Sequence, residues 1–184
     1  MKTMQYNDVD DKNFSFMICP VPLRQQPVFQ YWKLKEKSFF RWATLTTLMY
    51  STKLSVIWGS GFLFALYTVT IQSKQYGITL PNILWGAIVG EFAVFGCLLK
   101  LYTAWNYVHS RLIDRKIAYK VPKEEKIAVW QKSQLMMMRD SLIARFQVGY
   151  ILKRIKQTIL LVLLLFGMKL IILFLINNSQ FVYR

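Results

Sequence analysis

The chain has 184 residues, of which 54% are hydrophobic, and its 24 Lys and Arg residues against 9 Asp and Glu residues give a net charge of +15. This hydrophobic share is high for a soluble domain of this length, so the composition favours a single small membrane protein. The positive charge would suit either nucleic acid or an anionic lipid surface, and the positions of the charges decide between the two.

Residues 1–36 form the first predicted unit, an extended segment that contains the stretch CPVPLRQQP at 19–27. Each proline fixes its own φ and biases the preceding residue away from helix, so 18–27 is predicted to run extended or polyproline-like. The glutamine amides would then be free to bond another surface. The stretch is interpreted either as a docking strip for a partner or as a stiff tether to the next helix.

Residues 37–99 are predicted to hold one amphipathic interfacial helix at 37–53 and two transmembrane helices. The apolar runs at 54–71 and 83–99, with a third at 159–176, have 17 or 18 residues each, close to the roughly 20 that cross a hydrocarbon core of ~30 Å. Aromatic residues near the span ends, such as Trp85 and Trp105, are typical of interfacial anchors. The predicted fold class is an all-α membrane protein with three transmembrane helices and amphipathic helices at the interface.

Residues 100–158 are predicted to be a basic helical segment, and 159–184 the third transmembrane helix with a short tail. The stretch 134–157 repeats Leu135, Met138, Leu142 and Phe146 at helical spacing, with basic residues between them. It is interpreted as a helix packed at the membrane interface, or else as a face for a partner protein, because methionine-rich surfaces adapt to varied shapes. The charges and Pro122 of YKVPKEEK predict an exposed loop before this helix.

The distribution of Lys and Arg predicts the orientation. Residues 1–53 hold eight of them and 100–158 hold thirteen, whereas the loop 72–82 holds only Lys74 and the tail after 176 only Arg184. By the positive-inside rule the N-terminus and the basic segment face the cytoplasm or the stroma of a plastid, and the C-terminus faces the opposite side. Most of the charge then forms a belt beside anionic membrane lipids, which disfavours nucleic acid as a partner.

Residues for catalysis or metal binding are few. Cys19 and Cys97 have no companion ligands and no CxxC spacing, so neither a metal site nor a dithiol is predicted. His109 is the single histidine; it could ligate one haem or chlorophyll, although a filling role at the interface is favoured. The sequence lacks a GxSxG elbow and a glycine loop for phosphate. We therefore expect no enzyme, and no catalytic, cofactor-binding or metal-binding residue.

Two charged residues, Glu91 and Lys169, lie inside the apolar runs. Glu91 is eight residues from the outer end of the second run and Lys169 seven from the outer end of the third, so their depths agree within about 2 Å at about 1.5 Å per residue. An intramembrane charge pair is the favoured interpretation, because an isolated charge at this depth is costly. The alternatives are that each faces a partner subunit, that Glu91 is protonated, or that both belong to a proton or ion path.

Small residues beside these charges make close contact between helices sterically possible. Gly86 and Gly90 form a GxxxG step next to Glu91, and Gly61 with Ala65 offers a similar notch on the first transmembrane helix. Such small residues let two helix backbones approach each other.

Three blocks of the sequence, CPVPLRQQP, FQYWKLKEKSFFRWAT and RDSLIARFQVGYILKRIKQT, carry a family resemblance. They resemble small membrane proteins of plastids and cyanobacteria, the hypothetical chloroplast reading frame thirty-six family, also described as conserved in the green lineage and diatoms. The similarity covers residues 18–158. The matching residues are Cys19, Pro20, Pro22, Gln25, Gln26, Pro27, Ser38, Phe39, Phe40, Trp42, Arg139, Asp140, Leu142 and Gln147. The resemblance implies a plastid or cyanobacterial membrane, in particular the thylakoid, and supplies no catalytic residue.

The sequence thus predicts a non-catalytic accessory or biogenesis factor of a photosynthetic membrane complex, with that complex or its assembly intermediate as partner. The residues predicted to dock are Pro20, Pro22, Arg24, Gln25, Gln26, Pro27, Phe40, Arg41, Trp42, Arg139, Asp140 and Gln147. The alternative is a subunit of a membrane transporter or channel that uses Glu91 and Lys169. Three transmembrane helices are few for a transporter that acts alone, and no inverted repeat is visible.

Overall fold

The computed structural model describes residues 20–72, 80–121 and 126–182. The expectations for Cys19, for Lys74 in the loop between the first two transmembrane helices, and for Pro122 therefore lie outside the described residues.

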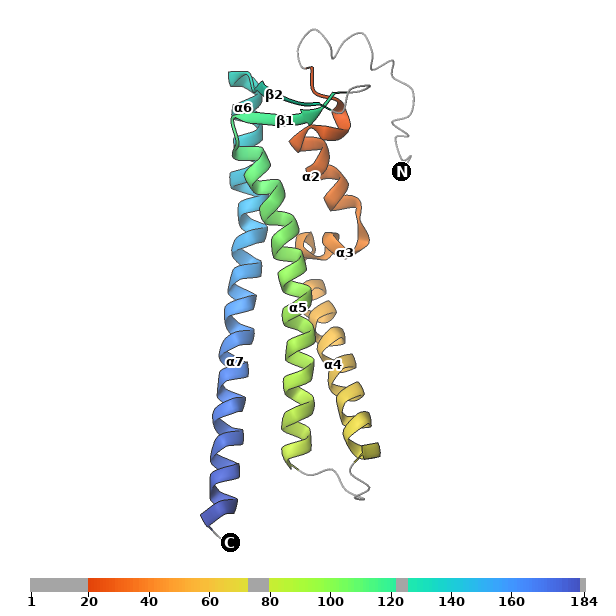
Figure 1. Cartoon of the computed structure of the whole chain (residues 1–184), viewed down its shortest axis with the longest axis vertical. Helices are drawn as coiled ribbons and strands as arrows, with labels where there is room; N and C mark the ends of the chain where they lie inside the picture. Colours follow the sequence, from red (N-terminus) through yellow and green to blue (C-terminus); the bar gives the residue numbers. More distant parts are fainter. Residues whose placement is uncertain (1–19, 73–79, 122–125, 183–184) are drawn as a thin grey trace.

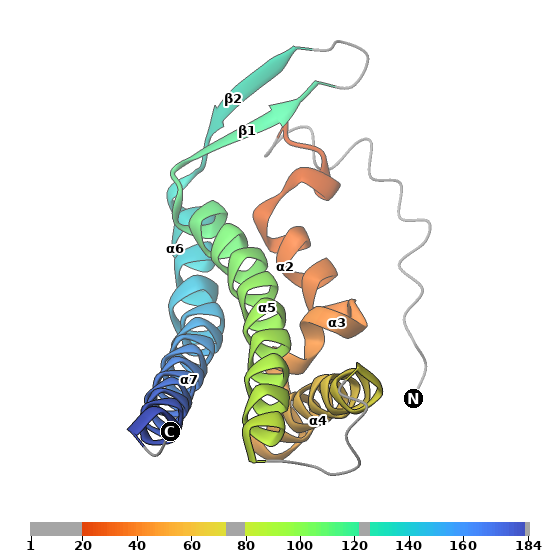
Figure 2. The ribbon, with the colours of Figure 1, turned by 60° about the horizontal axis from the view of Figure 1, so that its bottom comes forward.

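Three long helices run along the molecule, α4 (Thr47–Gln72), α5 (Leu80–Ile113) and α7 (Gly149–Val182) (Figure 1). Each belongs to a helical stretch that is long and apolar enough to cross a membrane, which confirms the predicted count of three within the described residues. The helix α5 lies between the other two and contacts both, with α4 on one side and α7 on the other (Figure 2). The helix α5 extends beyond the second apolar run and continues to Ile113.

The prolines predicted an extended or polyproline-like conformation for residues 18–27. The structure shows this conformation over only part of the segment. Pro22 has an extended conformation, with φ −54° and ψ 139°, but a 3-10 turn, η1 (Leu23–Gln25), follows it. Pro27 is then the first residue of α2 (Pro27–Glu36). Proline is well tolerated at this position, because its ring presets a helical φ and the N–H it lacks would have no helical acceptor.

The prediction of one helix over 37–53 is also wrong. A short helix, α3 (Ser38–Arg41), and a 3-10 turn, η2 (Trp42–Thr44), are followed by Leu45 in an extended conformation, with ψ 167°. The helix α4 begins only after this break. The carbonyl of Leu45 accepts a hydrogen bond of 2.7 Å from Nη1 of Arg154, a residue of α7. A contact from a distant helix thus stabilises the break.

A β-hairpin lies between α5 and the next helix. Its strands, β1 (Lys116–Lys120) and β2 (Ile127–Gln131), pair antiparallel with Ile117 opposite Trp130. The stretch YKVPKEEK, predicted as an exposed loop, begins inside β1 with Tyr119 and Lys120, and its residues 122–125 lie outside the described residues. The strands themselves were not predicted. Ile117 is buried against Val21 of the N-terminal segment, so the hairpin is anchored to the rest of the protein.

The basic helical segment and the third transmembrane helix form one rod. The helix α6 (Gln134–Leu142) continues through a π-helical turn, η3 (Ile143–Val148), directly into α7 (Figure 1). Ser133 begins the rod as its N-cap, and its hydroxyl accepts a hydrogen bond of 3.4 Å from the N–H of Met136. The helix predicted over 134–157 is thus present, and it is a direct extension of the transmembrane helix.

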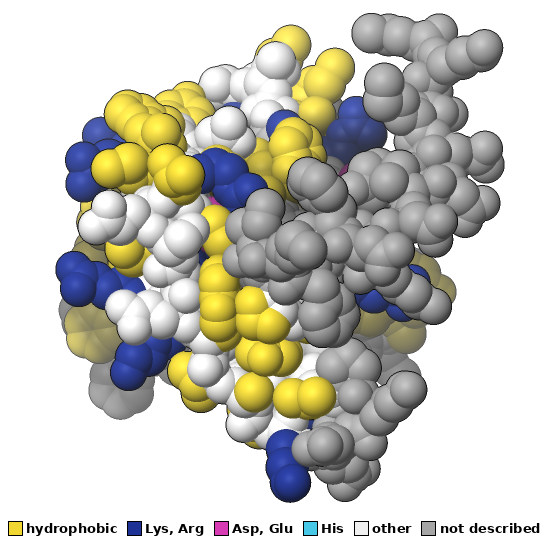
Figure 3. All heavy atoms as spheres, turned by 90° about the horizontal axis from the view of Figure 1, so that it is seen from above, with side chains coloured by type: hydrophobic (Ala, Val, Ile, Leu, Met, Phe, Trp, Pro, Cys, Tyr) yellow, Lys and Arg dark blue, Asp and Glu magenta, His cyan; other side chains and the backbone are white. Residues whose placement is uncertain are grey.

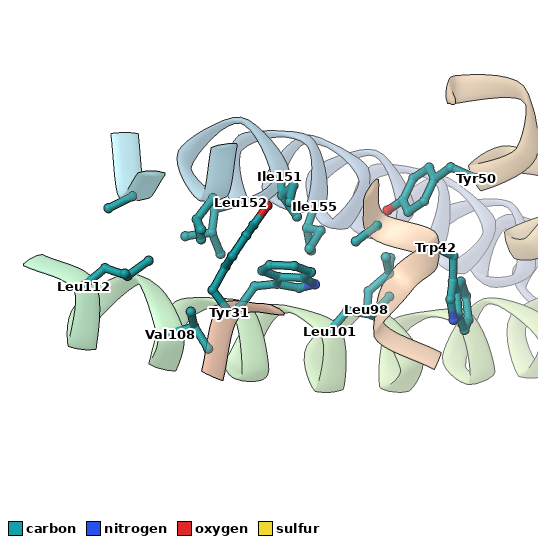
Figure 4. Close-up of a cluster of buried hydrophobic side chains, with 14 of the residues drawn as sticks. Tyr31, Trp42, Tyr50, Leu98, Leu101, Val108, Leu112, Ile151, Leu152 and Ile155 are labelled. Carbon is teal, nitrogen blue, oxygen red and sulfur yellow. The ribbon is translucent and has the colours of Figure 1, made fainter. Parts of the chain in front are cut away.

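The main hydrophobic core lies on the half of the molecule that carries the hairpin. It is a stripe along α5 that packs against α7, and Figure 4 shows Tyr31 reaching from α2 toward Ile151 and Leu152 of α7. The α5 members are Val94, Leu98, Leu101, Trp105, Val108 and Leu112, at the three- and four-residue spacing of one helix face. On the other half, α7 exposes side chains such as Leu164 and Phe174, as expected of a surface covered by lipid.

Candidate docking surface and intramembrane charge pair

The glutamines of CPVPLRQQP are bonded within the protein. The side chain of Gln25 forms two hydrogen bonds with the backbone of Lys120 in β1: Nε2 donates to the carbonyl at 3.1 Å, and Oε1 accepts from the N–H at 2.7 Å. Nε2 of Gln26 donates to the carbonyl of Val21 at 3.2 Å. The expectation that both amides are free is therefore wrong. The amide of Gln25 reaches both backbone groups of a strand residue, which attaches the N-terminal segment to the hairpin.

The predicted docking residues divide into an internal and an external set. Pro27, Trp42 and Asp140 are buried, and Pro22 and Phe40 are partly buried. The exposed set consists of Pro20, Arg24, Arg41, Arg139 and Gln147. The internal set can support a docking surface by positioning it, whereas only the external set is available to touch a partner. Docking by the external set stays a prediction.

Tyr31 and Trp105 make the contacts that connect the second and third sequence blocks. Neither residue was predicted to be a site residue. The hydroxyl of Tyr31 in α2 donates a hydrogen bond of 2.5 Å to Oε1 of Gln147, and its ring packs edge-to-face on Trp105 of α5. Nε1 of Trp105 donates to the carbonyl of Phe40 at 3.3 Å. Burial raises the pKa of the Tyr31 hydroxyl above its ordinary value of 10.0. These contacts hold α2 and α3 against the α5–α7 pair.

Lys132 is a second residue that sequence reasoning missed. Its side chain is fully buried, and Nζ lies 2.9 Å from Oδ2 of Asp140, whose side chain is 1% exposed. Nζ also donates to the carbonyls of Arg111 and Leu112 at 2.9 and 3.0 Å. A cation is favourable there, because the carbonyls in the last turn of a helix lack helical donors and carry the negative end of its dipole. Lys132 thus joins the end of α5, the end of the hairpin and α6.

The rod carries an exposed apolar stripe before its transmembrane part. Leu135, Met138, Leu142 and Phe146 are 81%, 64%, 57% and 69% exposed. Leu135 precedes the third apolar run by 24 residues, which is about 36 Å of continuous helix at about 1.5 Å per residue. A rod that crosses the bilayer along its axis carries this stripe out beyond the headgroups. Its geometry therefore favours the interpretation as a partner face over that of a helix packed at the membrane interface.

The surface around the stripe is basic. Arg139 and Arg145 are exposed beside it on the same rod. Seen from the end that carries the hairpin, hydrophobic side chains of the described residues lie among Lys and Arg side chains (Figure 3). We call Leu135, Met138, Leu142 and Phe146 the apolar stripe. Together with the basic residues beside it, the apolar stripe would be complementary to a partner surface that has an apolar groove with an acidic rim.

Inside the transmembrane part, the structure brings Glu91 and Lys169 together. Nζ of Lys169 contacts Oε1 of Glu91 in an ion pair that links α7 to α5. Glu91 is 4% exposed, and the side chain of Lys169 is 23% exposed. The contact neutralises two charges that would each be costly in hydrocarbon. A role of the pair in transport stays a prediction.

The helices α4 and α5 pack closely at the level of this pair, which confirms that the predicted glycine notches allow close contact. A Cβ atom added at Gly90 would lie 2.7 Å from the carbonyl oxygen of Trp58, and one added at Gly61 would lie 3.1 Å from Cα of Gly90. Gly90 has no room for a side chain and Gly61 lies tightly against it, so the two backbones are in close contact at the level of Glu91.

The remaining candidates for cofactor chemistry are separate from one another. Cys97 is partly buried against the main core, and His109 lies partly exposed on α5. In the described ranges, no group of three or more His, Cys, Asp or Glu residues is placed to hold a metal ion. A single haem or chlorophyll at His109 stays a prediction.

Comparison with known proteins identifies the family. The family profile described as "CGLD27-like: Conserved in the green lineage and diatoms 27" matches residues 19–161. The chain belongs to this family. Its CGLD27-like relatives include the ycf36 protein of Cyanophora paradoxa, which is 32% identical over 155 residues, 84% of this chain and 97% of the relative. The ycf36 protein of Porphyra purpurea is 30% identical over 142 residues, 77% of this chain and 86% of the relative.

A longer relative also belongs to this comparison. The chloroplastic protein Conserved in the Green Lineage and Diatoms 27 of Arabidopsis thaliana is 28% identical over 141 residues, which are 76% of this chain and 43% of the relative. No solved structure matches the chain. The family membership confirms the resemblance found from the three sequence blocks.

Proposed function

We propose that this CGLD27-like protein is a non-catalytic accessory or biogenesis factor of a photosynthetic membrane complex in the thylakoid of a plastid or cyanobacterium. Two findings support the setting: the chloroplastic name of the Arabidopsis relative and the three helices that can cross a membrane. The lopsided distribution of Lys and Arg supports an orientation with the hairpin end in the stroma or cytoplasm.

The observation that carries the proposal is the exposed apolar stripe on the continuous helical rod. An exposed row of large apolar side chains outside the transmembrane part is costly in water unless another surface covers it. The partner that fits is a protein of the complex, or of its assembly intermediate, with an apolar groove and an acidic rim. Arg139 and Arg145 would meet that rim, and the apolar stripe would fill the groove.

Affinity purification of the tagged protein from its native membrane tests the proposal. The double variant Met138→Ser with Leu142→Ser shortens two exposed side chains, and we expect it to lose the co-purifying subunits. The matched control is Val129→Ser with Ile127→Ser, which removes two similarly exposed apolar side chains from the hairpin. Equal capture by all three proteins, at equal abundance in the membrane, would contradict docking through the apolar stripe.

The second candidate function is a subunit of a transporter or channel. One observation favours it: Glu91 and Lys169 line a groove of about 310 Å³ between α4 and α7. Reconstitution in liposomes separates the two functions. Ion or proton flux that depends on Glu91 would favour transport, whereas no flux together with capture of photosynthetic subunits would favour the accessory function.

A further inference from the structure

A second cavity lies in the half of the molecule that carries the hairpin, at the end of this half that faces the membrane. It is a pocket of about 330 Å³ between α2, the break before α4, and the rod. None of the described residues that line it is acidic. Its polar lining includes Lys35, Thr44, Thr46, Thr47, Gln147 and Arg154. Two cations without an opposing carboxylate in the lining would attract an anion.

Arg154 is the cation that is most firmly positioned in this lining. Nη1 donates to the carbonyl of Leu45 at 2.7 Å, and the guanidinium carbon lies 4.2 Å from the centre of the Tyr50 ring. These two contacts fix the plane of the guanidinium group. The second terminal nitrogen, Nη2, is buried and has no acceptor among the described residues. A buried guanidinium nitrogen that lacks an acceptor is costly, so an anionic acceptor at this place would stabilise the site.

The beginning of α4 adds backbone donors to the same lining. The first helical hydrogen bond runs from the N–H of Tyr50 to the carbonyl of Thr46 at 3.0 Å. The N–H groups at positions 47–49 therefore have no acceptor within the helix, and the positive end of the helix dipole lies there. The break at Leu45 brings the chain to this point in an extended conformation, which places the helix end at the pocket.

The end of the pocket that is formed by Arg154 and Thr47 lies close to the membrane surface. Arg154 precedes the third apolar run by five residues and Thr47 precedes the first by seven, or about 7.5 and 10 Å of helix. The groove of about 310 Å³ between α4 and α7 begins near the hydrogen bond of 2.9 Å that joins Tyr50 to Thr158. Its lining is largely apolar and includes Leu54, Trp58, Leu161 and Leu165. The polar pocket and the apolar groove thus follow one another along the same helices toward the membrane interior.

We propose that this pair of hollows is a lipid site. The headgroup of an anionic lipid, bearing a phosphate or a sulfonate, occupies the basic pocket, and an acyl chain lies in the groove between α4 and α7. Arg154, Lys35 and the first N–H groups of α4 bind the anionic oxygens. The basic pocket shares one lining residue, Phe146, with the apolar stripe. The lipid proposal rests on Arg154, Lys35 and the beginning of α4, and it does not depend on the docking function.

The test uses the full-length protein, purified and reconstituted in nanodiscs of phosphatidylcholine that contain a small fraction of phosphatidylglycerol. Native mass spectrometry of the released protein measures which lipid stays bound. We expect the ratio of phosphatidylglycerol to phosphatidylcholine bound to the wild-type protein to be roughly tenfold higher than the same ratio in the disc, since charge-assisted hydrogen bonds favour the anion. Retention in proportion to the composition of the disc would overturn the proposal.

Three single substitutions locate the site. Arg154→Gln and Lys35→Gln should each reduce the preference for phosphatidylglycerol several-fold. Lys153→Gln is the control, because it removes the same charge from an exposed neighbour that does not line the pocket. Lys35→Gln keeps the test valid if Arg154→Gln fails to fold, since Arg154 also binds the carbonyl of Leu45. An equal loss in Lys153→Gln and Lys35→Gln would show general surface charge in place of a site.

A competition arm separates a lipid from a free anion. Excess inorganic phosphate should leave the retained phosphatidylglycerol unchanged, because the acyl chain adds apolar contact in the groove. The enlarging substitution Ser55→Phe, in the lining of the groove, should lower lipid retention without changing the basic pocket. Displacement of the lipid by phosphate, or full retention in Ser55→Phe, would contradict the lipid site as proposed.

Discussion

Nζ of Lys132 lies 2.9 Å from Oδ2 of Asp140, and both side chains are buried where α5, the hairpin and α6 meet. Arg139 also contacts Asp140, with Nη2 at 3.2 Å from Oδ1, but its side chain is half exposed. The buried cation bonds the end of α5 and the first turns of the rod at once. It therefore ties α6, which carries most of the apolar stripe, to the end of α5.

Lys132→Met should lower the free energy of unfolding by about 3–5 kcal/mol, because it leaves the Asp140 carboxylate buried with one exposed partner. The double variant Lys132→Met with Asp140→Leu should regain most of this loss, since it removes both charges. Arg139→Gln is the control, with an expected loss of no more than about 1 kcal/mol. Denaturant unfolding in detergent micelles measures all three, and equal losses for Lys132→Met and Arg139→Gln would refute the buried pair as an anchor.

The pair of Glu91 and Lys169 gives a second prediction. Glu91→Gln and Lys169→Met should each destabilise the protein, because either change leaves the other charge without its partner in the membrane. Combining the two should cost less than the sum of the single losses. Thermal unfolding in nanodiscs gives the three values, and strictly additive losses would be incompatible with direct pairing.

The contact of α4 with α5 at Gly90 gives a third prediction. Gly90→Ala places a methyl group 2.7 Å from the carbonyl oxygen of Trp58, so the two helices must move apart and we expect a loss of about 1–3 kcal/mol. Gly96→Ala is the matched control on the same helix, because nothing lies within 4 Å of the added Cβ. That control should be neutral or slightly stabilising, since alanine favours helix. The measurement is the unfolding midpoint of each variant in the same detergent. Equal midpoints for Gly90→Ala and Gly96→Ala would refute the close contact of α4 with α5.

The transmembrane helices and the depth of their charges could be predicted from the sequence because they depend on local patterns. Apolar runs of 17 or 18 residues mark the helices, and counting from their ends places Glu91 and Lys169 at one depth. The glycine notch follows from spacing on one helix face in the same way.

The hairpin end could not be predicted, because distant residues decide its structure. The break at Leu45 depends on Arg154, which is 109 positions away, and Gln25 is bonded to Lys120, 95 positions away. Lys132 lies in a polar stretch, for which the sequence predicts exposure to solvent. It can be buried because its Nζ donates hydrogen bonds to the carbonyls at the end of α5. Most of the motif residues chosen as docking candidates are therefore found inside this half, where they hold its helices and hairpin together.

Tyr31 gives a fourth prediction, on pH. Because burial raises the pKa of its hydroxyl, the unfolded chain loses this proton first as the pH rises, and the stabilising contribution of the folded state is lost above about pH 10. At neutral pH Tyr31→Phe should cost about 1 kcal/mol through its hydrogen bond to Gln147. This margin between wild type and variant should shrink as the pH rises through the alkaline range.

Unfolding measured from about pH 8 to about pH 11 checks this margin. Tyr150→Phe serves as the control, because the Tyr150 side chain is largely exposed and removing its hydroxyl should change little at any pH. A margin for Tyr31→Phe that stays constant over the whole range would contradict the assignment.

Photo-cross-linking in the native membrane tests the docking surface most directly. A photoreactive phenylalanine analogue at Met138 should form an adduct with one subunit of a photosynthetic complex or of its assembly intermediate. The same analogue at Val129, equally apolar and 63% exposed on the hairpin, should not form that adduct. Adducts with lipid alone at Met138, or the same protein adducts at both positions, would contradict a docking function for the apolar stripe.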